Sequence, residues 1–428
     1  MADALRSSAT PERRSPDAHA GVCRACDAPL QRVFADLRSS PLANSYLEPE
    51  DLARAEPFYP LTVFVCERCR LVQLPAWESP ENIFSDYAYF SSFSDSWLAH
   101  ARRYVEAMVD RFGIGEASQV VEVASNDGYL LQYFRERGVP VLGIEPAANV
   151  AAAAAEKGIP TRVEFFGSQG ASRLVEEGVR ADLLLGNNVL AHVPDLRDFV
   201  TGLATLLAPT GILTMEFPHL LRLIERNQFD TIYHEHYSYL SFAVVQRVFA
   251  EHGLTAFHVE ELATHGGSLR VYARHADDAS RPVGERIEAL LAAEREAGLE
   301  SLETYDRFGE RVRETKRKLL EFLIRVRREG ASVVGYGAAA KGNTLLNYCG
   351  VGTDLVDYVV DRSPHKQGRY LPGSRLPIFP PERIAETRPD YVLVLPWNLL
   401  DEIVEQMAHV RDWGGRFAVA IPELTVVG

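Results

Sequence analysis

Residues 120–134 read VVEVASNDGYLLQYF, which passes from an apolar strand through a tight polar turn into a helix. Three more apolar strands follow: VPVLGIEP at 139–146, ADLLLGN at 181–187 and GILTMEFP at 211–218. Helical patterns lie between them. Strands that alternate with helices predict a parallel sheet covered by helices on both faces. The sequence therefore predicts an α/β module that begins near residue 119.

Carboxylates and amides stand where these strands end. Glu122 ends the first strand, and Glu145 closes the next one 23 residues later. A carboxylate in that place can accept hydrogen bonds from a ribose diol at the carboxyl edge of the sheet. Phe166 is an aromatic side chain that could lie on an adenine, and Asn187 and Asn188 end the fourth strand. These residues predict a nucleoside site.

Two cofactors suit such a site, a dinucleotide or S-adenosylmethionine (SAM). A dinucleotide site needs G-x-G-x-x-G, which is absent here, whereas SAM carries no pyrophosphate and accepts a looser turn. The order of motifs resembles the class I SAM-dependent methyltransferases, although Ala124 and Asn126 stand where that class commonly has glycines. On these residues alone, a sheet of this type that binds no SAM remains an alternative.

Four of the five cysteines form two C-x-x-C pairs, Cys23 with Cys26 and Cys66 with Cys69. Each pair lets one turn present two thiolates, and two such turns complete the tetrahedron that Zn²⁺ accepts. Free reduced cysteines and a redox C-x-x-C are the alternatives. Because a site of four thiolates leaves no open position, we expect a structural zinc ion. Cys349 is expected to be a small core residue.

A second βα series starts at residue 331, and its first turn reads GYGAAA at 335–340. This matches G-x-G-x-x-A, and Asp361 ends the next strand, as in an NAD site. Lys341 and Asn343 at the start of the helix suit a diphosphate instead, because N–H groups at a helix N-terminus bind phosphate without any nicotinamide. These residues leave both alternatives open.

Two segments are rich in aromatic and ionisable side chains: YHEHYSY at 233–239 and FSDYAYFSSFSDSW at 84–97. A solvated loop rarely carries three tyrosines and two histidines, so the first segment is a candidate site. A buried polar network, or a metal held by His234 and His236, would be the alternatives. The second segment suits either a lid over a sugar or a domain interface. His192 could face the same pocket or be a core histidine.

Composition excludes several classes of protein. The 428 residues, 46% hydrophobic and 24% charged, are typical of a globular protein with two to four domains. A net charge of −14 repels phosphate backbones, so we expect no nucleic-acid partner. The chain has no run of 18 apolar residues and no signal peptide, which predicts no membrane segment and a cytoplasmic location.

Five features occur in order along the chain: the paired C-x-x-C motifs, SFSDSW, EVASNDGYL, YHEHYSYLS and GYGAAAKGNTLLNYCG. Together they resemble the C-methyltransferases that act on nucleotide-linked 4-keto-deoxysugars in antibiotic biosynthesis, over nearly the whole chain from Cys23 onward. The resemblance implies a zinc-binding N-terminal module, a SAM-binding Rossmann-like domain and a second Rossmann-like domain. These three parts would enclose the sugar nucleotide, so a monomer would suffice.

The expected organisation divides the chain into five parts. They are a disordered tail at 1–20, the zinc module at 21–80, the SAM-binding domain at 81–283, a helical linker at 284–330 and a nucleotide-sugar-binding domain at 331–428. The linker carries an apolar stripe of residues at three-, four- and seven-residue steps. Its members are Phe308, Val312, Leu319, Leu323 and Val326.

The resemblance also implies roles for residues, motif by motif. The catalytic residues would be Tyr87, His192, Tyr233, Glu235 and His236. SAM would be bound by Glu122, Asn126, Asp127, Gly128, Glu145 and Asn187, to which the aromatic argument adds Phe166. For the sugar nucleotide, with its diphosphate near the second helix start, we expect Tyr89, Ser91, Asn188, Lys341 and Asn343.

The expected reaction transfers a methyl group from SAM to C3 or C5, next to the ketone of a TDP-linked sugar. Neutral His236 would take the α-proton, and Glu235 would orient it or bind a sugar hydroxyl. Tyr233, Tyr87 or His192 would donate to the enolate oxygen. Two alternatives are an NAD(P)-linked oxidoreductase that uses the second module, and a zinc-ribbon interaction protein with inactive Rossmann domains.

Overall fold

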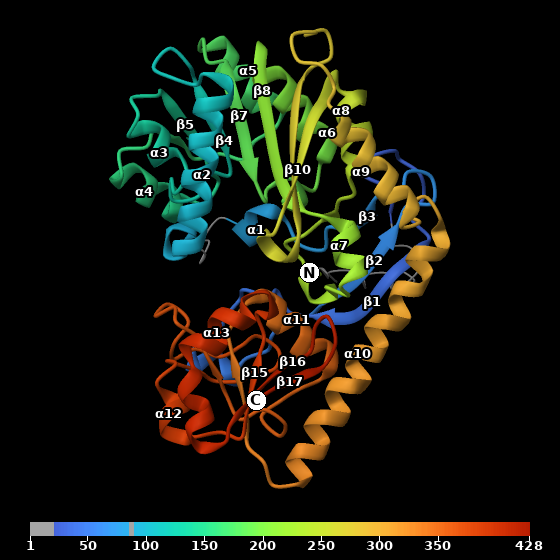
Figure 1. Ribbon diagram of the computed structural model, residues 1–428, viewed down its shortest axis with the longest axis vertical. Helices are drawn as coiled ribbons and strands as arrows, with labels where there is room; N and C mark the ends of the chain where they lie inside the picture. Colours follow the sequence, from blue (N-terminus) through green and yellow to red (C-terminus); the bar gives the residue numbers. More distant parts are fainter. Residues whose placement is uncertain (1–20, 85–89) are drawn as a thin grey trace, which may run out of the picture.

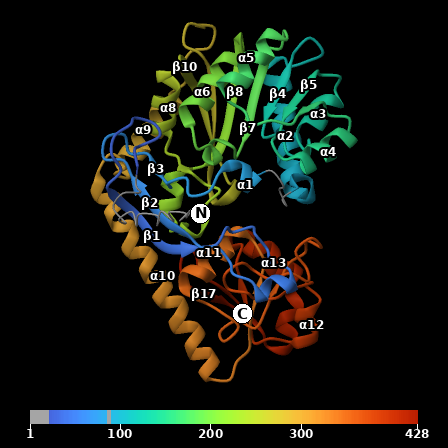
Figure 2. The same ribbon diagram turned by 180° about the vertical axis from the view of Figure 1, so that it is seen from behind.

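The computed structural model describes residues 21–84 and 90–428, and the described part contains three sheets (Figures 1 and 2). Tyr87 and Tyr89, expected in the site, lie outside the described residues. No helix in the described part is long and apolar enough to cross a membrane. The predicted pair of α/β modules is confirmed, together with a smaller N-terminal sheet.

The N-terminal sheet is antiparallel and has the order β1-β2-β3-β9. Its strands are β1 (Arg32–Ser40), β2 (Tyr59–Val65), β3 (Val72–Gln73) and β9 (Ser238–Tyr239). The short helix α1 (Pro80–Phe84) follows β3 along the chain. Strand β9 comes from a distant part of the sequence, directly after the YHEHY segment. The N-terminal module therefore takes the candidate site loop into its own sheet.

The middle sheet has the order β10-β11-β8-β7-β4-β5-β6. The last five strands are parallel, and β11 pairs antiparallel with both β8 and β10. Its strands are β4 (Val120–Val123), β5 (Val141–Ile144), β6 (Thr161–Arg162), β7 (Ala181–Asn187), β8 (Leu207–Pro218), β10 (Leu254–Leu262) and β11 (Ser268–His275). Its helices are α2 (Asp95–Phe112), α3 (Leu131–Arg135), α4 (Ala148–Glu156), α5 (Ser168–Glu176), α6 (Leu196–Leu206), α7 (Leu220–Glu225) and α8 (Phe242–Glu251).

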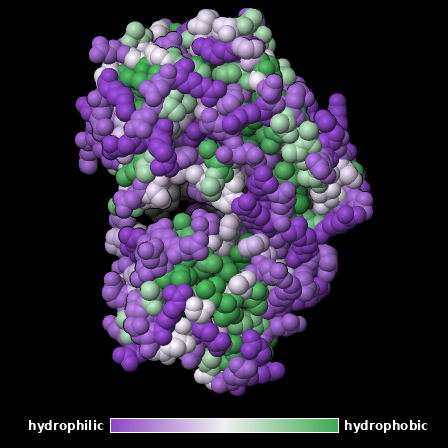
Figure 3. All heavy atoms as spheres, in the orientation of Figure 1, coloured by the Kyte–Doolittle hydropathy of each residue, from purple (hydrophilic) through white to green (hydrophobic). Residues whose placement is uncertain are grey.

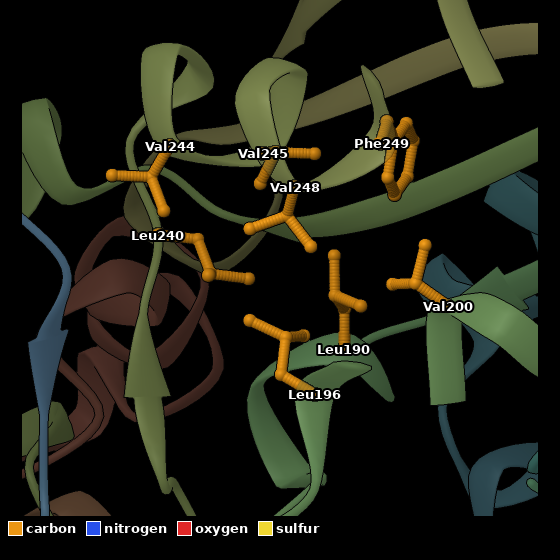
Figure 4. Close-up of a pocket in the computed structure, with 8 residues that line it drawn as sticks. All are labelled: Leu190, Leu196, Val200, Leu240, Val244, Val245, Val248 and Phe249. Carbon is orange, nitrogen blue, oxygen red and sulfur yellow. The ribbon is translucent and has the colours of Figure 1, made fainter. Parts of the chain in front are cut away.

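Both faces of the middle sheet are buried, which explains its continuous apolar strands. Leu183 and Leu185 pack in the cluster that contains α2, and Leu184 packs in the cluster that contains α6 and α8. A small hollow between α6 and α8 is lined only by apolar side chains such as Val200 and Val245 (Figure 4). Because it offers no polar group, this hollow belongs to the core and carries no chemistry.

Two helices, α9 (Glu285–Glu296) and α10 (Leu302–Arg328), connect the two α/β modules. The predicted apolar stripe of α10 is buried along its whole length. Phe308 stacks on Phe34 of β1 (ring centroids 4.5 Å apart), and Phe322 packs edge-on against Tyr391 in the C-terminal module (5.2 Å). Helix α10 therefore runs along one side of the molecule and joins its upper and lower parts (Figure 1).

The C-terminal sheet has the order β14-β13-β12-β15-β16-β17, parallel except for β17. Its strands are β12 (Val333–Tyr336), β13 (Val359–Val360), β14 (Ile378–Phe379), β15 (Tyr391–Val394), β16 (Arg416–Val419) and β17 (Thr425–Val427). Its helices are α11 (Ala340–Cys349), α12 (Arg383–Thr387) and α13 (Leu400–Gln406). In the space-filling view the molecule is hollowed between this module and the middle one (Figure 3).

Candidate active site

The four paired cysteines converge on one point. Their Sγ atoms all lie within 4.8 Å of one another, with Cys23 and Cys69 3.4 Å apart and Cys26 and Cys66 3.6 Å apart. Zinc–sulfur bonds of about 2.3 Å place sulfur atoms about 3.8 Å apart in a tetrahedron. The Gln73 amide also donates to Cys23 Sγ (3.1 Å), which suits a thiolate. The four residues fit a zinc ion.

The two C-x-x-C turns have the same backbone geometry. In the first, the amide of Asp27 donates to the Cys23 carbonyl, and in the second the amide of Arg70 donates to the Cys66 carbonyl (both 2.9 Å). Asp27 and Arg70 both adopt a left-handed conformation, with φ of 59° and 65°. The module thus has two equivalent knuckles that each direct a pair of thiols to the same centre.

The zinc module holds the YHEHY loop through Arg24, which lies between the first two cysteines. Its guanidinium donates to the carbonyl of Tyr237, to Ser238 Oγ (3.1 Å) and to the Leu74 carbonyl (2.6 Å). Strand β3 pairs with β9 directly beside these contacts. The backbone of the loop is therefore fixed by the fold of the zinc module.

The turn after β4 takes the shape of a glycine-rich turn without the glycines. Ala124 and Asn126 both have a left-handed backbone, with φ of 56° and 49°. Gly128 is also left-handed (φ 72°), and a Cβ there would lie 2.9 Å from the Ile159 side chain. The conformation that favours glycine is therefore kept at two positions where this sequence has larger residues.

Acidic side chains gather at this carboxyl edge. Glu145 accepts hydrogen bonds from the amides of Asn126 and Ala147 (both 2.9 Å), which leaves lone pairs on its two oxygens. Burial and the neighbouring Glu145 raise the pKa of Glu122 well above its ordinary value. Tyr129 forms a hydrogen bond with the buried Glu122 carboxyl group, and among the described residues Oδ1 of Asp127 is buried without a hydrogen-bond partner. These acceptors fit the ammonium and hydroxyl groups of SAM.

Ser91, expected to contact the substrate, instead lies on the cofactor turn. Its amide donates to Asn126 Oδ1 (2.8 Å), and the amide of Ser92 donates to Asp127 (3.3 Å). Lys157 donates to Ser92 Oγ (2.6 Å) and to the Asp127 carboxylate (3.0 Å). The segment that starts at residue 90 is therefore attached to the turn that would bind SAM.

The remaining cofactor candidates differ in their surroundings. Asn187 donates to the Tyr129 hydroxyl (3.2 Å) at the end of β7. Phe166 packs edge-on against Phe199 of α6 (5.4 Å), so its ring belongs partly to the helix layer. The neighbouring Phe165 is the more exposed ring, at 41%. Of the two aromatic residues, Phe165 is the one that offers a free face.

Three of the expected catalytic side chains meet at the YHEHY loop. The ring of Tyr233 lies 4.1 Å from that of His236, and the ring of His192 meets His236 edge-on at 4.7 Å. His236 Nδ1 donates to the Thr231 carbonyl (2.8 Å). Because a carbonyl only accepts, the proton lies on Nδ1, and Nε2 keeps its lone pair. Burial lowers the pKa of His236 to about 4, so the ring is neutral.

Glu235 and His234 point away from this group. Asn44 donates to Glu235 (2.6 Å), and His234 donates to the carbonyl of Pro60 (3.2 Å). His234 and His236 therefore serve different neighbours, and the only cluster of potential metal ligands found in the described part of the chain is that of the four cysteines. Glu235 contacts the N-terminal module, as does His234.

The C-terminal module reaches the site through Lys341. Its ammonium lies over the Trp397 ring (4.6 Å) and donates to Asn398 (2.6 Å). Trp397 donates to Asp230 (2.8 Å). Burial raises the pKa of Asp230 to about 7, although the nearby Lys341 lowers it. Asn343, two residues after Lys341 in α11, is fully buried. Lys341 thus lies in the gap between modules, and Asn343 does not.

The G-x-G-x-x-A turn makes hydrogen bonds with several protein groups. The Tyr46 hydroxyl and the Lys366 ammonium both donate to the Ala338 carbonyl (2.6 and 2.9 Å). Asp361, which would hold a ribose in an NAD site, accepts from the amides of Ala338 and Ser363 (both 2.8 Å). Tyr46 thus attaches the N-terminal module to the G-x-G-x-x-A turn of the C-terminal module.

Four residues at the site escaped the sequence analysis: Arg24, Asn44, Asp230 and His265. The first two act across long stretches of sequence, and no local pattern marks them. Asp230 lies in an unremarkable polar turn. His265 did leave a signal, since it precedes two glycines in a short hairpin turn, THGG at 264–267.

Comparisons with known proteins found matches along most of the chain. Family models match at residues 23–84 (zinc binding domain), 97–259 (methyltransferase domain) and 263–422 (C-methyltransferase C-terminal domain). The C-methyltransferase NovU of Streptomyces niveus is 38% identical over 405 residues, 95% of this chain and 96% of the relative. A ubiquinone biosynthesis O-methyltransferase of Methylobacterium nodulans is 33% identical over 101 residues, 23% of this chain and 39% of its own length.

Solved structures resemble the chain only in part. A magnesium protoporphyrin IX methyltransferase from Synechocystis, with bound SAM, covers 41% of this chain and 78% of its own, with 15% identity and a TM-score of 0.32. A SAM-dependent methyltransferase from Mesorhizobium loti covers 42% of this chain and all of its own, with 14% identity and a TM-score of 0.33.

Proposed function

The chain belongs to the family of SAM-dependent C-methyltransferases, and we propose that it methylates a carbon next to the ketone of a nucleotide-linked 4-keto-deoxysugar. The observation that carries this proposal is His236, a neutral histidine whose Nδ1 is bound to the Thr231 carbonyl. Its Nε2 is left as a base. Methylation of carbon needs such a base, because an α-carbon becomes a nucleophile only after it has lost a proton.

SAM supplies an electrophilic methyl group on a sulfonium that leaves as a neutral thioether. In the proposed step His236 Nε2 takes the α-proton of the sugar. The electron pair of the C–H bond forms the carbon–carbon double bond of an enolate, and the carbonyl π pair moves to the oxygen. When the enolate carbon accepts the methyl group, the carbonyl forms again.

The residues around His236 support this role. Tyr233 and His192 contact its ring and limit its rotation, so that Nε2 keeps one direction. Glu235, bound to Asn44, is proposed to orient the loop or to bind a sugar hydroxyl. Lys341 is proposed to offset the charge of the diphosphate. Tyr87 and Tyr89 are proposed to contact the sugar. Ser91, which lies on the cofactor turn, and Asn343, which is buried inside α11, are not.

A mass-spectrometric assay tests the proposal. The enzyme is incubated with SAM and a panel of TDP-4-keto-deoxysugars in D₂O, and the methylated carbon, C3 or C5, is located by NMR. We expect a gain of one methyl group on one sugar, and deuterium exchange at its α-carbon when SAM is left out. His236→Asn should lower both rates by about 10²–10⁴-fold.

His409→Asn, three residues after the end of α13 in the C-terminal module, is the matched control and should leave both rates unchanged. Methyl transfer that survives His236→Asn at the wild-type rate would overturn the assignment of the base. If no sugar of the panel gains a methyl group, the proposed substrate class is wrong.

A further inference from the structure

The turn between β10 and β11 places a second histidine at the site. In this sheet β11 runs antiparallel to β8, and Ser268 at its start pairs with Pro218 at the end of β8. Residues 263–267 therefore lie at the same edge as the carboxyl ends of β4, β7 and β8. That edge binds ligands in open α/β sheets. His265 stands in the middle of this turn.

The turn is held in a conformation that costs free energy. His265 has a left-handed backbone (φ 53°), which is uncommon for a residue with a side chain. Thr264 donates to buried Glu216 (3.1 Å), and Gln228 donates to the Gly266 carbonyl (2.9 Å). A Cβ on Gly266 would lie 2.3 Å from the Trp397 ring. Contacts from two modules thus fix the position of His265.

The contacts of the His265 ring determine which of its two nitrogens carries the proton. Asn188 Nδ2 donates to His265 Nε2 (3.1 Å), so in the neutral ring Nδ1 carries the hydrogen. Burial lowers the pKa of His265 to about 4, which keeps the ring neutral at pH 7. The ring packs against Trp97 (5.3 Å). None of the hydrogen bonds found among the described residues takes up this Nδ1–H.

His265 lies close to the base without touching it. A positive charge on His265 or on Lys341 lowers the pKa of His236, which indicates that both groups lie near that ring. No ring contact in the described part of the chain joins the two histidines, in contrast to Tyr233 and His192, which lie directly on His236. A donor to the carbonyl oxygen must stand apart from the base, because the oxygen is three bonds away from the proton that the base removes.

We propose that His265 is a catalytic residue that donates from Nδ1 to the ketone oxygen as it becomes the enolate oxygen. Asn188 is the positioning residue that fixes its tautomer. This assignment rests on the proposed function, and it replaces Tyr233 and His192 in the role of oxyanion donor. The sugar would then lie between His236 on one side and His265 and Lys341 on the other.

A matched pair of variants tests this role. In His265→Asn the side chain keeps an N–H donor. In His265→Asp the side chain has the shape of asparagine but no N–H donor. Asparagine and aspartate both tolerate the left-handed backbone. We expect His265→Asp to lower kcat and the SAM-independent deuterium exchange together by about 10²–10³-fold, with little change in KM. His265→Asn should stay within about tenfold of the wild-type enzyme. SAM affinity, measured by calorimetry, should be unchanged in both variants.

His258→Asn on β10, away from this edge, is the control and should keep wild-type rates. If His265→Asp does not fold, His265→Gly removes the donor and accepts the same backbone. Wild-type exchange in the variant without a donor, or an equal loss in Asn and Asp variants, would overturn the role of His265. A wild-type enzyme that neither exchanges nor methylates any keto-sugar would instead overturn the proposed function.

Discussion

At the scale of single residues, the site is built from neutral histidines. Burial lowers the pKa of His236 and His265 to about 4, and it lowers that of His192 well below its ordinary value. A ring that is neutral at pH 7 can accept a proton at one nitrogen and donate one from the other. The hydrogen bond at the second nitrogen decides which role each ring has.

The pH dependence of the rate follows from these shifts. A folded-state pKa of about 4, below the ordinary value of about 6.5, means that His236 is unprotonated at all pH values above about 5. We therefore expect the rate of methyl transfer to fall only below about pH 5. The free energy of unfolding also falls as the pH drops from about 6.5 to about 4, because the unfolded state binds the proton more tightly than the folded state. A rate profile recorded with circular dichroism on the same samples checks this, and a limb near pH 6.5 in folded protein would contradict it.

Ala124 is a residue in the wrong conformation for its type. A left-handed alanine costs about 1–2 kcal/mol, and glycine loses about 0.4–1 kcal/mol through the entropy of the unfolded chain. Ala124→Gly should therefore raise the free energy of unfolding by up to about 1 kcal/mol. The same change at Ala152, exposed in α4, should lower it by about 1 kcal/mol. Denaturant melts of both variants compare the signs, and equal losses would exclude strain at Ala124.

At the scale of elements, the pairing of β3 with β9 is the feature that places the catalytic loop. Strand β9 follows His236 by two residues, so its register with β3 sets where the histidine lies. Arg24 adds three donors to the backbone and side chains of the same region. A two-residue strand is weak alone, and the arginine stabilises it.

Loss of Arg24 should reduce catalysis more than cofactor binding. Arg24→Met leaves the carbonyl of buried Leu74 without the Arg24 donor, which costs about 1–3 kcal/mol, whereas the Tyr237 carbonyl keeps the Leu74 amide. It should also let the loop shift, and a shift of about 1 Å can cost about 10²-fold in rate. Arg68→Met, an exposed site in the second knuckle, is the control. Kinetics and SAM titrations separate the effects, and a wild-type kcat would contradict the argument.

At the scale of the whole molecule, three modules close around one gap. Asn44 binds Glu235 of the middle module, and Tyr46 binds Ala338 of the C-terminal module. Trp397 reaches back from the C-terminal module to Asp230 and Gly266. These contacts connect the zinc module to both walls of the site.

Removal of zinc should therefore abolish activity, although none of the four cysteines belongs to the proposed catalytic residues. Structural zinc contributes about 10–16 kcal/mol in small peptides, so a chelator should lower the melting temperature and methyl transfer together. Metal analysis should give one zinc ion per chain, lost in Cys66→Ser and kept in Cys349→Ala. Full activity in protein shown to be free of zinc would refute this coupling.

Local patterns predicted the elements of both α/β modules, the apolar stripe of α10 and the convergence of the four cysteines. Such features follow from periodicity and spacing, which act over a few residues. The partners of the catalytic loop were beyond reach, because Arg24 and Asn44 lie about two hundred residues away from it in the sequence. The placement of Ser91 on the cofactor turn was missed for the same reason.

By itself the sequence determined the βα order and the convergence of the four cysteines, and it predicted a histidine base in the YHEHY segment. The tertiary structure alone decided which histidine nitrogen is free, since that depends on the Thr231 and Asn188 groups that each ring meets. It also decided that Tyr46 and Lys366 both donate to the Ala338 carbonyl in the G-x-G-x-x-A turn. Hydrogen bonds between distant segments select tautomers and join modules, and no local pattern records them.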